Sequence, residues 1–413
     1  MKKAAAAWLV GIFVLALFAC AAIAQMEQPP PVPRFERGAG SVTAGAEIFD
    51  RIVYVPATVN GAGPFTFVLD TGAGQFSALD YSVASSLGLR QTLVAQGGGA
   101  GEDTVGIYLV DSAAVAVPGL SFEPRAVVGI PLHRMDPHWG KRKDGLIGGD
   151  LLSTLVTVID YERGRLEFHD ASSYEYRGPG ERIPVHIDGG YIFIESRVLL
   201  NGVDEPIDAL LMLDTGVRLS LFNMPFAKEH SLPAQSPSTV SGVTGFGLGG
   251  ISRGIVGRVK GIRIGSILLE NPVVNFSTDE TGVLASPDFS GIIGADILSR
   301  FTVVLDYRRS QIFLETNAGF DAPFEFDMCG IRFFMEGERF DTFTVFRVYD
   351  GSPAAEAGIE AGDVVTEIDG RAAAGFTWQD LREYLQREGA TVRFTIDRGG
   401  RAFNVSVRLR RLV

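Results

Sequence analysis

Short apolar runs separated by turn residues fill the chain from about residue 44 onward. The runs are rich in β-branched and aromatic residues, and Gly, Asn and Asp stand between them at short intervals. This pattern is typical of an all-β domain. Helical patterns are brief: in the segment "DYSVASSLG", Asp80 is placed to cap a helix that Gly88 ends.

Two of the apolar runs end on an aspartate, where a strand has no reason to place a charge that lacks a partner or a function. Residues 65–74 read "FTFVLDTGAG" and residues 210–219 read "LLMLDTGVRL". Both triplets belong to an internal repeat, which appears when residues 50–170 are laid over residues 190–315. In each copy a glycine cluster follows, and then an apolar-apolar-Gly segment, Leu146-Ile147-Gly148 or Ile292-Ile293-Gly294.

A repeat that brings one aspartate from each copy can form a carboxylate pair between two lobes. Two carboxyl groups a few ångströms apart hold one proton between them, because mutual repulsion raises the pKa of one member. The ionised member can take a proton from a water molecule that attacks a peptide carbonyl. The protonated member can donate to the developing oxyanion.

On these residues the chain resembles a two-lobed aspartic protease of the pepsin and retropepsin type, in its bacterial form, over about residues 45–316. The resemblance implies a mostly β fold, with two tandem retropepsin-like β-barrel lobes that form a pepsin-like pseudo-dimer. It also implies that Asp70 and Asp214 are the catalytic dyad, that Thr71 and Thr215 tie the two loops together, and that Gly72 and Gly216 leave room for their close approach. The substrate would be a peptide or unfolded protein, bound as an extended strand.

The residues after the two triplets depart from the pepsin pattern, in which a hydroxyl commonly reaches the carboxylate. Ala73 and Val217 stand at these positions. The loss of a hydrogen bond to the charged form predicts raised pKa values and activity at mildly acidic to neutral pH. Valine is the less usual residue here and could crowd the second loop.

Glycine clusters at 97–101 and 245–250 lie where a flap hairpin would turn in each copy. We interpret them as mobile covers over a substrate cleft, with ordinary flexible turns as the alternative. Gly245, Gly247 and Gly250 also fit a G-x-G-x-x-G pattern. The sequence after them is typical of strands and turns, which argues against a dinucleotide site.

Residues 322–413 leave the repeat and resemble a PDZ domain. The specific element is "GSPAAEAGIEAGDVVTEIDG", and "TWQDLREYLQREG" after it has the pattern of an amphipathic helix. The resemblance implies an α/β domain that binds a peptide terminus through the loop Gly330-Ile331-Arg332-Phe333, with arginine where glycine is frequent. Packing against the protease lobes is the alternative role.

The first residues have the pattern of an export signal. Lys2 and Lys3 precede an apolar stretch that closes with Ala22-Ile23-Ala24. We expect cleavage before Gln25 and a periplasmic or secreted protein. A second interpretation places the cut before Cys20, which would then carry a lipid anchor that attaches the protein to a membrane.

Composition excludes several classes of function. The net charge of −12, or −14 without the signal, disfavours a nucleic-acid partner. Cys329 is the one cysteine beyond the signal, so neither an intramolecular disulfide nor a cysteine-based zinc site is expected. His133 and His138 share the segment "PLHRMDPHWGKRKDG", which we interpret as an exposed, charged loop rather than a metal site. No cofactor or metal is expected.

The predicted domains are a signal peptide (1–24), a Pro-rich linker (25–44), protease lobe 1 (45–175), protease lobe 2 (176–318) and a PDZ domain (322–413). Two functions stay open. One is an exported aspartic endopeptidase whose PDZ domain recruits or regulates substrates. The other is a protease-like peptide-binding protein with weak or no turnover.

Overall fold

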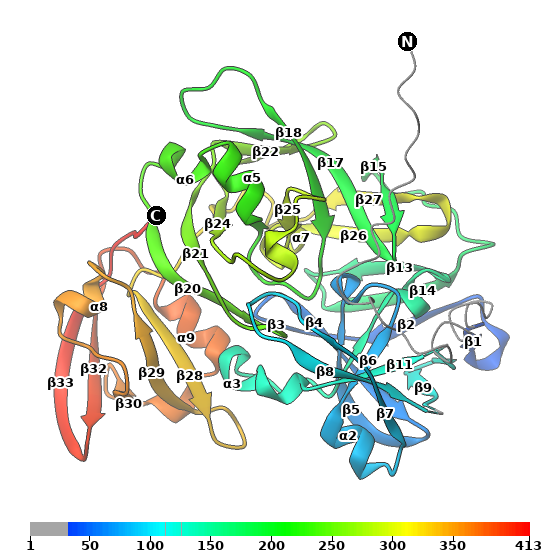
Figure 1. Ribbon diagram of the computed structural model, residues 1–413, viewed down its shortest axis with the longest axis horizontal. Helices are drawn as coiled ribbons and strands as arrows, with labels where there is room; N and C mark the ends of the chain where they lie inside the picture. The colour runs from blue at the N-terminus through cyan, green and yellow to red at the C-terminus, as the bar shows by residue number, and fades with distance from the viewer. Residues whose placement is uncertain (1–31, 112, 125) are drawn as a thin grey trace.

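The computed structural model describes residues 32–111, 113–124 and 126–413, and Figure 1 shows two β lobes and a C-terminal domain. The predicted signal peptide and the site of the predicted lipid anchor, Cys20, lie outside these residues. None of the helices in the described part of the chain is both long and apolar enough to span a bilayer.

Lobe 1 is built on an 11-stranded sheet in the order β1-β10-β9-β4-β5-β12-β6-β11-β8-β7, with β3 paired to β4. Its strands are β1 (Arg34–Phe35), β3 (Glu47–Phe49), β4 (Ile52–Val59), β5 (Ala62–Leu69), β6 (Ser77–Asp80), β7 (Gln91–Gly97), β8 (Val105–Val110), β9 (Val115–Val117), β10 (Leu120–Phe122), β11 (Val127–Ile130) and β12 (Gly145–Ile147). Its helices are α2 (Tyr81–Ser86), α3 (Asp136–Trp139) and α4 (Gly149–Leu152).

Lobe 2 is built on a 10-stranded sheet in the order β20-β21-β24-β19-β25-β18-β17-β22-β23, with β16 paired to β17. Its strands are β16 (His186–Asp188), β17 (Tyr191–Leu199), β18 (Ile207–Leu213), β19 (Leu221–Phe222), β20 (Val240–Gly247), β21 (Gly250–Arg258), β22 (Gly261–Ile264), β23 (Ile267–Glu270), β24 (Val273–Ser277) and β25 (Gly291–Ile293). Its helices are α5 (Met224–Glu229), α6 (Leu232–Gln235) and α7 (Ala295–Leu298).

The sequence repeat appears in the structure as equivalent pairings in the two lobes. β12 runs parallel to β5, with Ile147 opposite Leu69, and β25 runs parallel to β18, with Ile293 opposite Leu213. These central strands are apolar on both faces, as parallel strands buried between layers must be. The predicted mostly β fold with two repeated lobes is confirmed.

A third sheet joins the two lobes. Its six strands have the order β15-β27-β26-β13-β14-β2, and β13 of lobe 1 pairs antiparallel with β26 of lobe 2, with Ile159 opposite Val303. The strands are β2 (Ser41–Gly45), β13 (Leu155–Asp160), β14 (Arg165–Asp170), β15 (Glu181–Pro184), β26 (Phe301–Asp306) and β27 (Gln311–Thr316). One continuous hydrophobic core includes residues of this sheet and of both lobes.

The predicted linker 25–44 differs from what the structure shows in its described part. Residues 34–35 form β1, and β2 pairs with β14 along its whole length. Its side chains alternate, and Ala44 is fully buried while Ser41 and Thr43 are exposed. The prolines before it masked this short period-two pattern.

The C-terminal domain has a six-stranded sheet in the order β28-β29-β30-β32-β33, with β31 paired to β30. Its elements are β28 (Ile331–Glu336), β29 (Thr342–Val348), α8 (Pro353–Glu356), β30 (Val364–Ile368), β31 (Arg371–Ala372), α9 (Trp378–Tyr384), β32 (Thr391–Arg398) and β33 (Arg401–Arg408). The predicted amphipathic helix is α9, which Thr377 and Asp380 start with a capping box. Trp378, Leu381 and Leu385 are buried in the domain core.

Two local predictions have different outcomes. The helix expected after Asp80 is α2: the Asp80 carboxylate accepts from Ser82 N–H at 2.8 Å, and Gly88 has a positive φ of 65°. The exposed loop expected around His133 and His138 is wrong. The segment contains α3, packs between lobe 1 and the C-terminal domain, and buries Leu132 and Met135. The prediction failed because the charged residues of the segment obscured its apolar face in the sequence.

Candidate active site

The two aspartates stand at equivalent positions directly after β5 and β18. Asp70 N–H donates to Ile147 O and Asp214 N–H donates to Ile293 O, each at 3.0 Å. The apolar-apolar-Gly segments predicted from the sequence therefore hold the start of each aspartate loop. The loop turns at once, and the N–H of Gly72 or Gly216 donates to the carboxylate of its own triplet at 2.8 Å.

Each carboxyl group lies against the glycine of the other triplet. A Cβ on Gly72 would stand 2.1 Å from Asp214 Oδ2, and a Cβ on Gly216 would stand 2.6 Å from Asp70 Cγ. Any side chain at either glycine would therefore displace a carboxylate. The structure thus brings Asp70 and Asp214 together across the pseudo-twofold axis, and the predicted close approach of the two loops is observed.

Thr71 and Thr215 connect the two aspartate loops by hydrogen bonds, and both threonines are fully buried. Thr71 Oγ1 donates to Leu213 O at 2.8 Å and accepts from Thr215 N–H at 3.0 Å. Thr215 Oγ1 donates to Leu69 O at 2.7 Å and accepts from Thr71 N–H at 3.1 Å. These four hydrogen bonds fix one aspartate loop relative to the other.

Burial raises the pKa of both aspartates. For Asp214 the negative charge of Asp70 adds to the effect of burial and raises the pKa well above its usual range. For Asp70 the effect of burial is opposed by the Gly72 N–H and by a hydrogen bond with the Asp214 side chain. Burial and the proximity of the two carboxyl groups therefore disfavour the state in which both are ionised. The direction agrees with the expectation from Ala73 and Val217, but burial is the leading cause.

A second pair of buried aspartates supports the site and was not recognised from the sequence. Ser77 Oγ donates to Asp150 Oδ1 at 2.7 Å and accepts from Gly148 N–H at 3.2 Å. In lobe 2, Ser220 Oγ donates to Asp296 Oδ1 at 2.6 Å and accepts from Gly294 N–H at 2.9 Å. The repeat carried the signal, because both aspartates keep the same place in it.

The two glycine clusters meet each other. The tip between β7 and β8 forms a parallel bridge with the tip between β20 and β21, at Gly101 and Gly249. Gly249 N–H donates to Ala100 O at 2.9 Å, and Asp103 N–H donates to Gly249 O at 2.8 Å. Both clusters are hairpin tips, as the flap interpretation expects, and the tips are hydrogen-bonded to one another.

Apolar side chains of each lobe pack against the tip of the opposite lobe. Val217 packs against a lobe 2 cluster that includes Phe193 and Leu284, and Ala100 of the lobe 1 tip packs against the same cluster. Burial and the charge of Asp70 raise the pKa of Asp214, and the N–H of Val217 lowers it by less. A lobe 1 cluster around Ile107 and Met135 includes Leu248 of the lobe 2 tip. Each tip thus contributes to the apolar wall of the opposite lobe.

Lys143 is a further charged group near the dyad that sequence reasoning missed. It is only 3% exposed, and its ammonium lies 3.5 Å from the centre of the Trp139 ring. Burial lowers the pKa of Lys143 to about 7, although the charges of Asp136 and Asp70 raise it. Burial raises the pKa of Asp70. The Lys143 charge lowers it, by less than the hydrogen bonds from Gly72 and Asp214 do. Lys143 lies in a segment that we interpreted from the sequence as exposed and charged, so nothing in the sequence set this lysine apart as buried.

The loop predicted to bind a peptide terminus leads into β28 in the C-terminal domain. Gly330 has a positive φ of 90°, and a Cβ there would stand 2.1 Å from the Cβ of Ser352. Ile331 and Phe333 are buried in the domain core, while Arg332 is half-buried. The N–H groups of Cys329 and Gly330 donate to the side chain of Asp327. In this part of the molecule, and in the rest of the described residues, no three His, Cys, Asp or Glu side chains gather to hold a metal.

Comparison with known proteins identifies two domains. Residues 55–151 match the aspartyl protease family, and residues 344–398 match the PDZ domain family. The prediction of an aspartyl protease domain followed by a PDZ domain is confirmed. Together the two domains support a peptide-bond hydrolase.

Two solved structures are similar over different extents. The aspartic proteinase from Irpex lacteus is 15% identical, and the match covers 68% of this chain and 99% of that protein with a TM-score of 0.41. The photosystem II D1 C-terminal processing protease is 23% identical, and the match covers 21% of this chain with a TM-score of 0.20. That match spans 24% of the processing protease.

Replacing Thr71 by valine tests the cross-link between the loops. Thr71→Val leaves Leu213 O and Thr215 N–H unpaired in a buried site, which costs about 1–3 kcal/mol for each group. We expect a lower midpoint of thermal unfolding, and peptidase activity reduced by roughly tenfold or more as the dyad loosens. The matched control is Thr157→Val. Thr157 is equally buried, but its hydroxyl has no hydrogen-bond partner among the described residues, so its loss should lower neither the unfolding midpoint nor the activity.

Replacing Lys143 by methionine tests the electrostatic environment of Asp70. The Lys143 charge lowers the pKa of Asp70, so its removal should raise that pKa. The acidic limb of the pH profile of kcat/KM should then move to higher pH by roughly half a unit, a small shift for a neighbouring charge. Lys260→Met, at an exposed lysine of lobe 2, is the control. An acidic limb at the same pH in both variants would contradict the assignment.

Proposed function

We propose that this chain is an aspartic endopeptidase in which Asp70 and Asp214 share one proton and activate a water molecule. The observation that carries the proposal is the placement of each carboxyl group against the glycine of the opposite triplet. Two ordinary turns after strands have no reason to converge in this way. The burial that raises both pKa values supports a pair that keeps one proton at mildly acidic to neutral pH.

The proposed chemistry assigns one role to each carboxyl group. Ionised Asp70 removes a proton from the water molecule as the water oxygen attacks the peptide carbonyl carbon. Protonated Asp214 gives its proton to the carbonyl oxygen, which forms a neutral tetrahedral diol. The peptide nitrogen then takes the proton held on Asp70 and leaves as an amine, while a diol hydroxyl returns a proton to Asp214. The cycle ends with the dyad in its starting state.

The proposed substrate is a peptide or an unfolded protein segment in extended form. The hairpin tips offer backbone N–H and C=O groups, which favour a strand bound by main-chain hydrogen bonds. The apolar clusters of the two lobes favour apolar side chains on both sides of the scissile bond. The tips are bonded to one another through Gly249 and Ala100, so they must separate before a substrate enters.

Replacement of either aspartate tests the shared dyad. Asp70→Asn and Asp214→Asn should each reduce cleavage of an unfolded, carboxymethylated protein by about 10²–10⁴-fold. The double variant should lose little more, because the two groups act as a unit. Cleavage is measured between about pH 4 and 8, the range expected for a raised dyad.

Asp208→Asn is the matched control, because Asp208 is 89% exposed in its side chain and pairs with Arg197 at the surface of lobe 2. Full activity in this variant together with loss in the other two supports the proposal. A wild-type protein that cleaves nothing at any pH would instead support the alternative of a peptide-binding protein with the protease fold.

We also propose that the protein is exported, on the pattern of residues 1–24. Expression of the full chain in a bacterium should yield a product in the periplasm or medium whose first residue is Gln25, as read by mass spectrometry of the N-terminal peptide. A product that begins at Cys20 with added lipid mass would establish the anchored form, and Cys20→Ala would then release it. An unprocessed cytoplasmic product would contradict export.

A further inference from the structure

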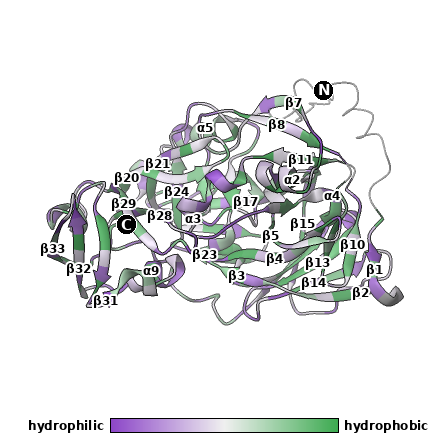
Figure 2. Cartoon of the chain, turned by 90° about the horizontal axis from the view of Figure 1, so that it is seen from below, coloured by the Kyte–Doolittle hydropathy of each residue, from purple (hydrophilic) through white to green (hydrophobic). Residues whose placement is uncertain are grey.

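The PDZ domain turns its peptide-binding edge toward the protease lobes. A PDZ ligand adds as a strand beside an exposed sheet edge, next to the long helix. In this domain the corresponding edge is β28, which among the described strands pairs only with β29, and the helix is α9. Figure 1 shows both elements on the side of the domain that faces α3, and Figure 2 shows α3 beside β28.

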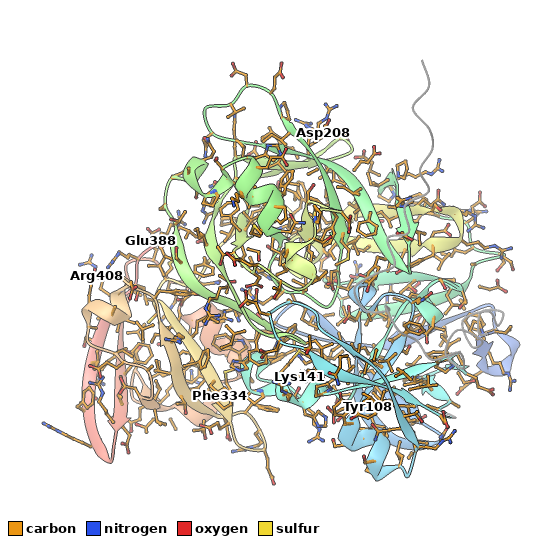
Figure 3. The ribbon with its side chains drawn as sticks, viewed as in Figure 1. Tyr108, Lys141, Asp208, Phe334, Glu388 and Arg408 are labelled. Atoms are coloured by element: carbon orange, nitrogen blue, oxygen red, sulfur yellow. The ribbon has the colours of Figure 1, made fainter. Side chains whose placement is uncertain are left out.

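A segment of lobe 1 crosses that edge. A Cβ on Gly140, which directly follows α3, would stand 2.7 Å from the Cβ of Trp378 and 3.2 Å from Met335. On the opposite face of the sheet, the ring of His138 lies edge-on to Phe334 at 5.0 Å and to Phe346 at 5.1 Å. Figure 3 shows Phe334 at this boundary. The segment therefore contacts side chains on both faces of β28 near its end.

A turn of lobe 1 holds the helix beside that edge. Asp50 N–H donates to Gln379 Oε1 at 2.9 Å, and the Asp50 carboxylate lies 3.2 Å from Arg382 Nη2. The same carboxylate lies 3.6 Å from Arg218 Nε. Arg218 is four residues after Asp214, so one carboxylate joins the PDZ helix to a catalytic loop. The Nε–H of Arg382 has no hydrogen-bond partner among the described residues.

The loop before β28 is also occupied. PDZ loops offer backbone N–H groups to the carboxylate of a peptide terminus. Here the Asp327 carboxylate accepts from the N–H groups of Cys329, at 3.2 Å, and of Gly330. An internal carboxylate thus already engages the first N–H of the predicted loop, that of Gly330.

The docked domain also contacts the β20–β21 hairpin of lobe 2, whose tip is bonded to the lobe 1 tip. Tyr349 Oη donates to Val243 O in β20 at 2.9 Å. Nearer the tip, the Phe246 ring stacks on His138 at 4.0 Å, and Phe246 O accepts from Trp139 Nε1 at 3.1 Å. The lobe 2 hairpin is therefore attached both to the PDZ domain and to the segment that covers the edge of β28.

We infer that the structure is a latched form, in which the PDZ peptide groove is closed by lobe 1 and the docked domain holds the lobe 2 hairpin shut. A peptide with a free C-terminal carboxylate competes with the Asp50 turn, the α3 segment and Asp327 for the groove. Its binding releases the domain, and the release frees the hairpin to open over Asp70 and Asp214. The activity half of this inference rests on the proposed function, whereas the binding half does not.

The latch has a measurable thermodynamic signature. A ligand that binds only the released form has an apparent affinity reduced by the small fraction of molecules that is released. Any change that weakens the latch without touching the groove must therefore tighten peptide binding. By reciprocity, bound peptide must favour the released form, with its hairpin free to open, by the same factor by which release favours peptide binding.

Asp50→Asn is the variant of choice, because Asp50 belongs to lobe 1 and leaves every PDZ residue unchanged. Its φ of 46° is one that asparagine also adopts readily. In an Asp70→Asn background, which removes cleavage, the probe is a decapeptide that ends in valine with a free carboxylate. We expect Asp50→Asn to tighten binding about fivefold or more. The same peptide with a C-terminal amide should bind more weakly to both proteins.

Hydrogen exchange reports the hairpin in the same proteins. The amides of 240–247 should exchange faster in Asp50→Asn and, in the Asp70→Asn background, faster with peptide than without. Tyr349→Phe removes only the hydroxyl bonded to Val243 and should accelerate the same amides. Asp208→Asn, which breaks an exposed ion pair elsewhere, should change neither exchange nor affinity.

Equal peptide affinity with and without Asp50→Asn would overturn the inference, as would an absence of binding to both proteins or unchanged exchange in 240–247. The activity arm uses Tyr349→Phe with an active dyad, in which kcat/KM should rise about threefold or more, a modest coupling. If nothing is cleaved but the binding and exchange shifts appear, the latch stands and the proposed function fails. If cleavage depends on the dyad but neither shift appears, the proposed function stands and the latch fails.

Discussion

The whole site depends on keeping two like-charged groups together in a buried place. Asp70 and Asp214 would repel each other if both were ionised, and burial makes each charge more costly still. The fold offsets this with backbone N–H groups inside each loop and with four threonine hydrogen bonds beneath them. The glycines, the central parallel strands and the buried serine–aspartate pairs all serve that one geometry. In the proposed function, a proton shared between the two carboxyl groups relieves the remaining repulsion and lets the pair act as acid and base.

Much of the site could be predicted from the sequence because the internal repeat carries its residues in both copies. The repeat placed Asp70 and Asp214 at equivalent strand ends, and the glycine after each threonine indicated a close approach. The repeat also contained Asp150 and Asp296, but a single chain does not say whether a repeated aspartate is buried or exposed. Ser77 and Ser220, which bond to them, differ too little from ordinary turn residues to attract notice.

The relation between the domains could not be predicted, for a different physical reason. Contacts such as Asp50 with Arg382 and Tyr349 with Val243 join residues far apart in the chain and belong to no period. The segment around α3 was misjudged because its apolar residues are spaced singly among charges. Such a segment reads as exposed until its partners are known. The PDZ resemblance was correct, but the orientation of its binding edge comes from docking and not from any motif.

The sheet between the lobes has a consequence for how the molecule folds and how it can fail. Each half contributes three strands, β2, β14 and β13 from the first and β26, β27 and β15 from the second, and the halves meet at β13 and β26. A first half produced alone would leave β13 as a long, apolar, unpaired edge. Because the junction is antiparallel, a second copy of β13 can take the place of β26. A severed lobe would therefore tend to pair with its own kind, as a symmetric homodimer would.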